Sequence, residues 1–225
     1  MAQGRPGGTG IRCRERVWTM RQRARVISEF TANSDGPVHG VSYDGRQVWV
    51  ATGTHIRAFD PADGREIRAL AAPAHAGTAF DGHHLFQIAD DVIQKVDPAT
   101  GDIVSTIPAP GGGKDSGLAW ADGYLWVGQY RDRQIIQVDP ASGAVVRTIA
   151  TERFVTGVTW VDGELWHGYS EDGSGGLVQI DPGDGHELGS LEMPGLSVSG
   201  VESDGAKRFF CGGGNSGVVR IVSRD

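Results

Sequence analysis

The chain has 225 residues, of which 39% are hydrophobic and 35 are glycine, and its formal net charge is −7. This length and composition indicate one large domain rather than a disordered chain, and the acidic balance argues against nucleic acid as a partner. The two cysteines, Cys13 and Cys211, predict no disulfide framework. Because the sequence shows neither a secretory signal nor a run of 18 apolar residues, we expect a soluble, cytoplasmic protein without a membrane partner.

The first 22 residues, MAQGRPGGTGIRCRERVWTMRQ, differ from the rest of the chain. They are rich in Arg and Gly and show no hydrophobic periodicity. We expect this basic tail to be loosely ordered. Residues 23–225 are then expected to form a single domain, whose first strand is predicted at residues 25–30.

Five copies of one sequence pattern follow this strand. Each copy has a Gly before a short apolar run, an Asp-Gly turn and an alternating strand, and four copies add an Asp-Pro turn before a last strand. A period near 40 residues with four short strands per repeat is typical of a β-propeller. The pattern therefore predicts an all-β, five-bladed β-propeller with four-stranded antiparallel blades. The copies open at Gly40, Gly77, Gly117, Gly157 and Gly200.

Closure of the ring is predicted from the two ends of the repeat region. In the third copy, the strands are predicted at residues 116–120, 124–129, 134–139 and 144–149. The fifth copy ends without its Asp-Pro turn or its outer strand. Residues 25–30 match the outer strands in pattern, so we expect them to pair with the last blade and remove its open edge.

Equivalent positions separate scaffold residues from candidate functional residues. The Asp-Gly and Asp-Pro turns lie on one face and are nearly identical, whereas the loops of the opposite face vary, as expected where a scaffold carries its site. His83, His84 and His186 fall in the turns and are expected to be exposed. One aromatic position in the second strand of every blade is predicted to fill the space between blades, with Trp49, Phe86, Trp126, Trp166 and Phe210.

Polar residues that occur in only one blade gather toward the variable face. His39, His75 and Asp115 lie within two residues of a blade's first Gly, and Glu202 takes an inner-strand position that is small in the other blades. If these residues converge at one mouth, they form a ligand site. The candidate catalytic residues are His39, His167 and Glu202. The candidate substrate contacts are Gln87, Gln129, Tyr169, Arg131 and Cys211.

The segments HGVSYDGRQVWVATG, LFQIAD and VTGVTWVDGELW, with the Asp-Pro turns, resemble bacterial and plant glutamine cyclotransferases over about residues 25–225. The resemblance implies a five-bladed propeller that converts N-terminal glutamine to pyroglutamate with release of ammonia. It implies that Gln87 matches a family glutamine, that His167 replaces an asparagine and that Val50 replaces the catalytic glutamate. Valine cannot transfer a proton, so inefficient cyclisation is implied unless Glu202 or His167 takes over that role.

Three functions remain open at this stage. The first is an enzyme of the cyclotransferase type that acts on a small molecule or peptide. The second is a metal-dependent hydrolase or lyase, because imidazole and carboxylate groups suit a divalent metal; its candidate ligands are His39, His75, Asp115 and His167. The third is a non-catalytic propeller that binds a peptide or small molecule. A propeller fold is compatible with all three.

Overall fold

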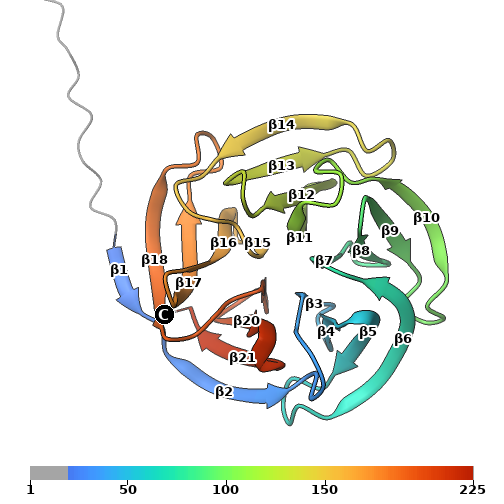
Figure 1. The fold of residues 1–225 in the computed structure, drawn as a ribbon, viewed down its shortest axis with the longest axis horizontal. Helices are drawn as coiled ribbons and strands as arrows, with labels where there is room; N and C mark the ends of the chain where they lie inside the picture. The colour runs from blue at the N-terminus through green and yellow to red at the C-terminus, as the bar shows by residue number, and fades with distance from the viewer. Residues whose placement is uncertain (1–19, 225) are drawn as a thin grey trace, which may run out of the picture.

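The computed structural model describes residues 20–224, which form five β-sheets arranged as blades around a central axis (Figure 1). In every blade the strands follow one another from the axis to the rim, and the four strands pair in antiparallel fashion. The predicted all-β, five-bladed propeller is confirmed. No helix among these residues is long and apolar enough to cross a membrane.

The first three blades are continuous in sequence. From the axis outward, blade 1 contains β3 (Gly40–Tyr43), β4 (Val48–Ala51), β5 (Gly53–Phe59) and β6 (Glu66–Ala74). Blade 2 contains β7 (Thr78–Phe80), β8 (Leu85–Ala89), β9 (Val92–Val96) and β10 (Ile103–Pro108). Blade 3 contains β11 (Asp115–Ala121), β12 (Tyr124–Gln129), β13 (Gln134–Val138) and β14 (Val145–Ala150).

The last two blades each include a strand from the beginning of the described chain. Blade 4 contains β15 (Val158–Val161), β16 (Glu164–Glu171), β17 (Ser174–Ile180) and β18 (Glu187–Pro194), with β1 (Met20–Arg23) added at its rim. Blade 5 contains β19 (Gly200–Ser203), β20 (Arg208–Gly212) and β21 (Val218–Ser223), with β2 (Val26–Thr31) as its outer strand; η1 (Gly214–Ser216) precedes β21.

The N-terminal strand closes the ring as predicted. β2 pairs antiparallel with β21, from Val26 opposite Val222 to Thr31 opposite Val218. The sequence pattern had placed this strand at residues 25–30, one residue earlier at each end. Strands from opposite ends of the repeat region therefore share one sheet, and the outer edge of β21 is paired.

Strand β1 is a feature that the sequence pattern did not predict. It runs parallel to β18, with Met20 opposite Gly189 and Arg23 opposite Glu192. Residues 20–22 of the predicted loose tail therefore form a strand. Residues 1–19 lie outside the described residues, so for them the expected loose order remains a prediction.

The first Gly of each repeat packs directly against its equivalent in the next blade, and together the five residues form a ring of glycines around the axis. A Cβ atom added to Gly117 would lie 2.7 Å from the carbonyl carbon of Gly157, and one added to Gly200 would lie 2.8 Å from the nitrogen of Val41. Real Cβ atoms do not approach backbone this closely, so any side chain here would push two blades apart.

Aromatic side chains fill the space between neighbouring blades. The five residues of the equivalent second-strand position are at most 7% exposed, which confirms their predicted place in the core. Three of them pack against an aromatic residue of the next blade in sequence. The pairs are Phe86 with Trp120, Trp126 with Trp160, and Trp166 with Phe209, at ring-centroid distances of 5.5, 5.0 and 5.3 Å. This close packing of rings fixes each blade against its neighbour.

Candidate functional site

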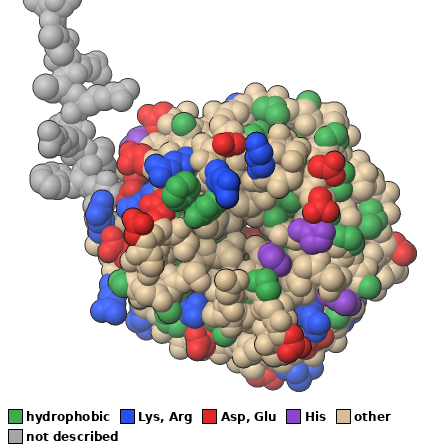
Figure 2. Space-filling model, in the orientation of Figure 1, with side chains coloured by type: hydrophobic (Ala, Val, Ile, Leu, Met, Phe, Trp, Pro, Cys, Tyr) green, Lys and Arg blue, Asp and Glu red, His purple; other side chains and the backbone are tan. Residues whose placement is uncertain are grey.

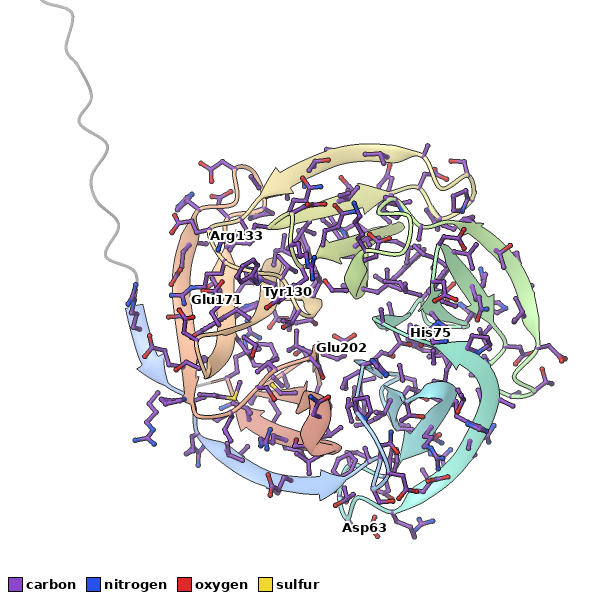
Figure 3. The ribbon with its side chains drawn as sticks, viewed as in Figure 1. Asp63, His75, Tyr130, Arg133, Glu171 and Glu202 are labelled. Carbon is purple, nitrogen blue, oxygen red and sulfur yellow. The ribbon has the colours of Figure 1, made fainter. Side chains whose placement is uncertain are left out.

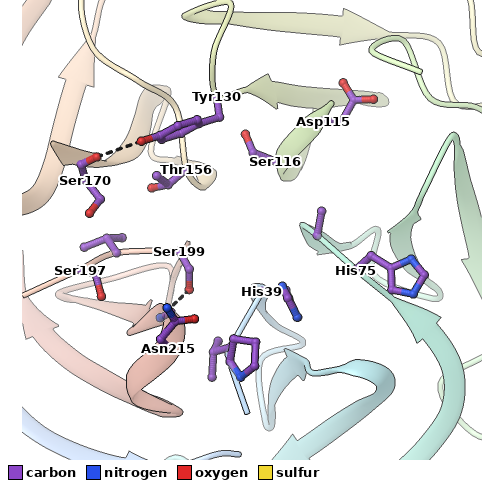
Figure 4. A pocket seen from close by; sticks show the side chains of 15 residues that line it. His39, His75, Asp115, Ser116, Tyr130, Thr156, Ser170, Ser197, Ser199 and Asn215 are labelled. Carbon is purple, nitrogen blue, oxygen red and sulfur yellow. Dashed lines mark hydrogen bonds between the residues drawn. The ribbon is translucent and has the colours of Figure 1, made fainter. Parts of the chain in front are cut away.

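A cavity of about 460 Å³ opens at the variable face of the ring, over the central axis (Figure 4). The inner strands all start at this face, and the residue just before each glycine of the ring contributes to the cavity wall. Equivalent positions of five blades thus meet around one space, which we call the mouth cavity. Its walls include the five residues His39, Ala76, Ser116, Thr156 and Ser199.

The wall of the mouth cavity is polar but carries little charge. Hydroxyl and amide groups come from several blades, and none of the described residues that line the cavity is Lys or Arg. Figure 2 shows histidine side chains beside the hollow at the centre of this face. Such a wall suits a ligand with uncharged donors and acceptors more than a phosphate or another strong anion. The further polar residues are Tyr130, Ser170, Ser197 and Asn215.

His39 is the titratable residue best placed to act in the mouth cavity. Its backbone N–H donates a hydrogen bond of 2.9 Å to the carbonyl of Ala51, which fixes it at the start of blade 1. The imidazole is partly buried, and this burial, followed by the charge of His75, lowers its pKa below the usual 6.5. His39 is therefore neutral at pH 7 and can accept a proton.

The other two mouth residues predicted from the sequence are held by neighbours. His75 stands at the rim, where its Nδ1 lies 2.9 Å from Oδ1 of Asp90. Asp115 is buried and accepts hydrogen bonds from the Gly111 N–H at 2.9 Å and from Nε2 of Gln129 at 3.0 Å. The pKa of Asp115 is raised, because the effect of burial exceeds that of the two hydrogen bonds, which lower it. The predicted substrate contact Gln129 thus positions Asp115 and does not line the cavity.

His167 and Glu202, the other two candidate catalytic residues, lie outside the mouth cavity. His167 is 1% exposed, and its Nδ1–H donates to the Gly168 carbonyl at 3.0 Å. Glu202 follows Gly200 by two positions and extends from β19 toward the axis (Figure 3), where it accepts hydrogen bonds from the Thr159 hydroxyl and the Ser203 N–H. The ring of glycines thus lies between Glu202 and the cavity wall.

The other four predicted substrate contacts do not line the mouth cavity. The Gln87 amide is fully buried and donates to the carbonyls of Ala76, Gly77 and Ile88 at 3.1, 3.2 and 2.9 Å, so it supports the cavity wall from behind. Cys211 is buried between blades, and burial raises the pKa of its thiol to about 12. Arg131 is exposed in its loop and does not line the mouth cavity. Tyr169 lines a separate cavity beside the mouth.

The proposed metal ligands do not form a metal cluster. Among the residues that the structure describes, one group of three or more His, Cys, Asp or Glu has its ligating atoms within 4.8 Å of one another, and it consists of Asp181, Asp184 and His186 in an exposed turn. His75 bonds to Asp90, and His167 bonds to a backbone carbonyl. Among the described residues, these four side chains are thus not gathered into one group at the mouth.

Glu202 and His167 should give opposite contributions to stability as pH changes. Burial raises the pKa of Glu202 from 4.5 to about 7, so its stabilising effect is complete below pH 4.5 and is lost as pH rises through 7. Burial lowers the pKa of His167 from 6.5 to about 4, so stability is lost as pH falls through this range.

We compare the free energy of unfolding at pH 7.5 with that at pH 4.5. The value at pH 7.5 minus the value at pH 4.5 should be about 2 kcal/mol larger in Glu202→Gln than in wild type, a figure reduced for the partial exposure of Glu202. His167→Gln should change this difference in the opposite direction, because it removes the loss at acid pH. Urea unfolding at the two pH values measures both effects. Parallel pH profiles for wild type and both variants would show that neither group titrates as described.

The hydroxyl residues of the cavity wall were missed from the sequence. Serine and threonine are ordinary loop residues, so Ser116, Thr156 and Ser199 carried no signal of their own. The available signal was positional, because each immediately precedes the glycine of its repeat, as His39 does. Aligning the repeats at the glycine would have identified these three residues together with His39 and Ala76.

Comparison with known proteins gives one family match. The family model described as a repeat of unknown function (DUF6923) matches residues 76–208, which is more than half of the chain. No curated protein matches the sequence.

Among solved structures, the chain is similar to the glutaminyl cyclase of Myxococcus xanthus, with a TM-score of 0.76 and 15% identity over 91% of this chain and 97% of that chain. It is also similar to the hydrazine synthase of Kuenenia stuttgartiensis, with a TM-score of 0.51 and 18% identity over 80% of this chain and 56% of that chain. For the WD40 propeller domain of Doa1 the values are 0.54 and 18%, over 85% of this chain and 65% of that chain. At these identities the similarity shows a glutaminyl cyclase-like propeller fold.

Proposed function

We propose that this chain, which belongs to the repeat family of unknown function DUF6923, uses the mouth cavity to act on a small molecule or on the N-terminal end of a peptide. The observation that carries the proposal is the cavity itself: uncharged hydroxyl groups from several blades surround one neutral histidine, His39. The reaction class that we assign is slow glutamine cyclotransfer.

The chemistry of cyclisation suits this wall. The amine nitrogen of an N-terminal glutamine bonds to the carbon of its side-chain amide, the bond from that carbon to the amide nitrogen breaks, and ammonia leaves. One proton must move from the attacking amine to the departing nitrogen. His39 is the group that we assign to this transfer, because it is neutral at pH 7 and lines the cavity. The surrounding hydroxyl groups hold the amide.

Low activity is part of the proposal. The resemblance to glutamine cyclotransferases implies that Val50 stands in place of the catalytic glutamate, and Val50 is fully buried in the core between blades 1 and 5. Asp115 already accepts two hydrogen bonds, which leaves it poorly placed to replace that acid. A single general base at the mouth supports turnover far below that of an efficient enzyme.

We expect slow release of ammonia from peptides that begin with glutamine, and a loss of about a hundredfold or more in kcat/KM with His39→Ala. The rate should fall in the acid range, at a pH below the ordinary histidine pKa of 6.5, because the pKa of His39 is lowered and protonated His39 cannot accept a proton. His83→Ala is the matched control, since His83 is exposed on the turn face; it should keep full activity, and its stability should change by less than about 0.5 kcal/mol.

The other outcomes separate the remaining functions. Peptide binding without ammonia release, lost in His39→Ala, would identify a non-catalytic binding propeller. Turnover that survives His39→Ala but is abolished by Glu202→Gln would move the proton transfer to Glu202. Peptide binding and turnover that are both unchanged by His39→Ala would contradict the site.

A further inference from the structure

A second cavity of about 270 Å³ lies in blade 4, beside the mouth, and we call it the blade-4 cavity. Strand β16 separates the two spaces, because Ser170 lines the mouth cavity whereas its neighbours Tyr169 and Glu171 line the blade-4 cavity. The rest of its wall comes from β17, β18, the loop before β15 and the unpredicted strand β1, which contributes Arg21.

The carboxylates of the blade-4 cavity outnumber its guanidinium groups. Nε of Arg153 lies 3.2 Å from Oε2 of Glu187, which is not among the lining residues, and the Arg153 guanidinium packs 4.4 Å from the ring centroid of Tyr169. Arg153 is therefore paired with Glu187 and also attracted by Glu171, so the two guanidinium groups of Arg153 and Arg21 face four carboxylates. The remaining charged lining residues are the carboxylates Glu171, Asp172 and Glu192 and the single guanidinium of Arg21.

Two groups in the wall of this cavity are fixed in position and can take a further hydrogen bond. Tyr169 is 3% exposed, and within the part of the chain that the structure describes its hydroxyl makes no hydrogen bond. One oxygen of Glu171 accepts the Phe154 N–H at 2.7 Å, which holds the carboxylate at the cavity and leaves its other lone pairs available. The Tyr169 hydroxyl is accessible from the cavity rather than enclosed in the core, so a ligand with several N–H donors suits this wall.

We propose that the blade-4 cavity binds the cationic side chain of a basic peptide residue, arginine or lysine. The carboxylates of Glu171 and Glu192 accept hydrogen bonds from the guanidinium or ammonium group, and the Tyr169 hydroxyl offers a further acceptor. The positive charge of Arg21 repels such a ligand and therefore limits its affinity. This binding site does not depend on the activity that we assign to the mouth cavity.

The test uses Nα-acetyl-arginine amide as the probe and Nα-acetyl-citrulline amide as its neutral isostere, with calorimetry or NMR titration of the full chain. We expect the arginine probe to bind at least about tenfold more tightly than the citrulline probe. Glu171→Gln and Glu192→Gln should each weaken its binding by about tenfold, because each removes a charge-assisted hydrogen bond. Arg21→Ala should strengthen binding severalfold, and added salt should weaken it.

The matched control is Glu152→Gln, which removes an exposed carboxylate of the same region that does not line the cavity. It should leave binding unchanged, as should His39→Ala at the mouth. Equal binding of the two probes, no binding of the arginine probe at millimolar concentration, or equal losses for Glu152→Gln and Glu171→Gln would overturn the proposal. Should Glu171→Gln unfold the protein, Tyr169→Phe and Glu192→Gln serve as the decisive variants.

Discussion

Deleting residues 1–31 should prevent the propeller from folding, whereas deleting residues 1–24 should leave a folded protein. The longer deletion removes β2 and with it the whole outer strand of blade 5, including every ladder hydrogen bond between Val26–Thr31 and β21. It also removes Phe30, whose ring lies 5.3 Å from that of Phe59 in blade 1. Blade 5 would then present an unpaired strand edge and lose a contact to its neighbour, and both effects favour aggregation.

The shorter deletion is the matched control, because it removes β1 and uncovers only the rim of blade 4. Circular dichroism melts and size-exclusion chromatography distinguish the outcomes. We expect a cooperative transition for wild type and for the chain lacking residues 1–24, and aggregation or no transition for the chain lacking residues 1–31. A melting temperature equal to that of wild type after the longer deletion would show that β2 does not close the ring.

The fold could be predicted because the same pattern of strands and turns occurs five times in the sequence. In blade 3 the predicted second strand, 124–129, has the observed bounds of β12, and the other three agree within one residue at each end. The Asp-Gly turn between the first two strands was identified from its residues, and Asp122 and Gly123 take the positive φ values of 51° and 82° that a two-residue hairpin needs. Strand β1 was missed because it belongs to no repeat and forms only where the edge of β18 is available.

The site was only partly predictable, because a repeat register identifies equivalent residues but not the direction in which they point. His39 precedes the glycine of its repeat and reaches the mouth. His167 and Cys211 occupy the second strand, pair across the sheet with Val158 and Val201, and point into the packed space between blades instead of toward the axis. Polarity alone could not separate these two environments. The repeat glycines can be read from the sequence, but their close packing around the axis, which sets the depth of each position, is seen only in the structure.

Replacing one glycine of the ring should therefore destabilise the protein far more than an ordinary surface substitution. The Cβ of Gly117→Ala would lie 2.7 Å from both the carbonyl carbon of Gly157 and the nitrogen of Val158, and these are backbone atoms that cannot rotate away. We expect a loss of about 3 kcal/mol or more in the free energy of unfolding, at the upper end of overpacking effects. Urea or thermal unfolding provides the measurement.

Gly36→Ala is the matched control, because its Cβ would meet first the side-chain nitrogen of Asn33, at 3.2 Å, and that flexible group can move. Neither glycine has a positive φ, so the comparison tests contact and not backbone conformation. Alanine also reduces the entropy of the unfolded chain, which by itself stabilises a protein by about 0.4–1 kcal/mol. The sign of the Gly117→Ala effect is therefore decisive: stabilisation would mean that the blades do not touch at the axis, whereas strong destabilisation would confirm that backbone contact holds the floor of the mouth cavity.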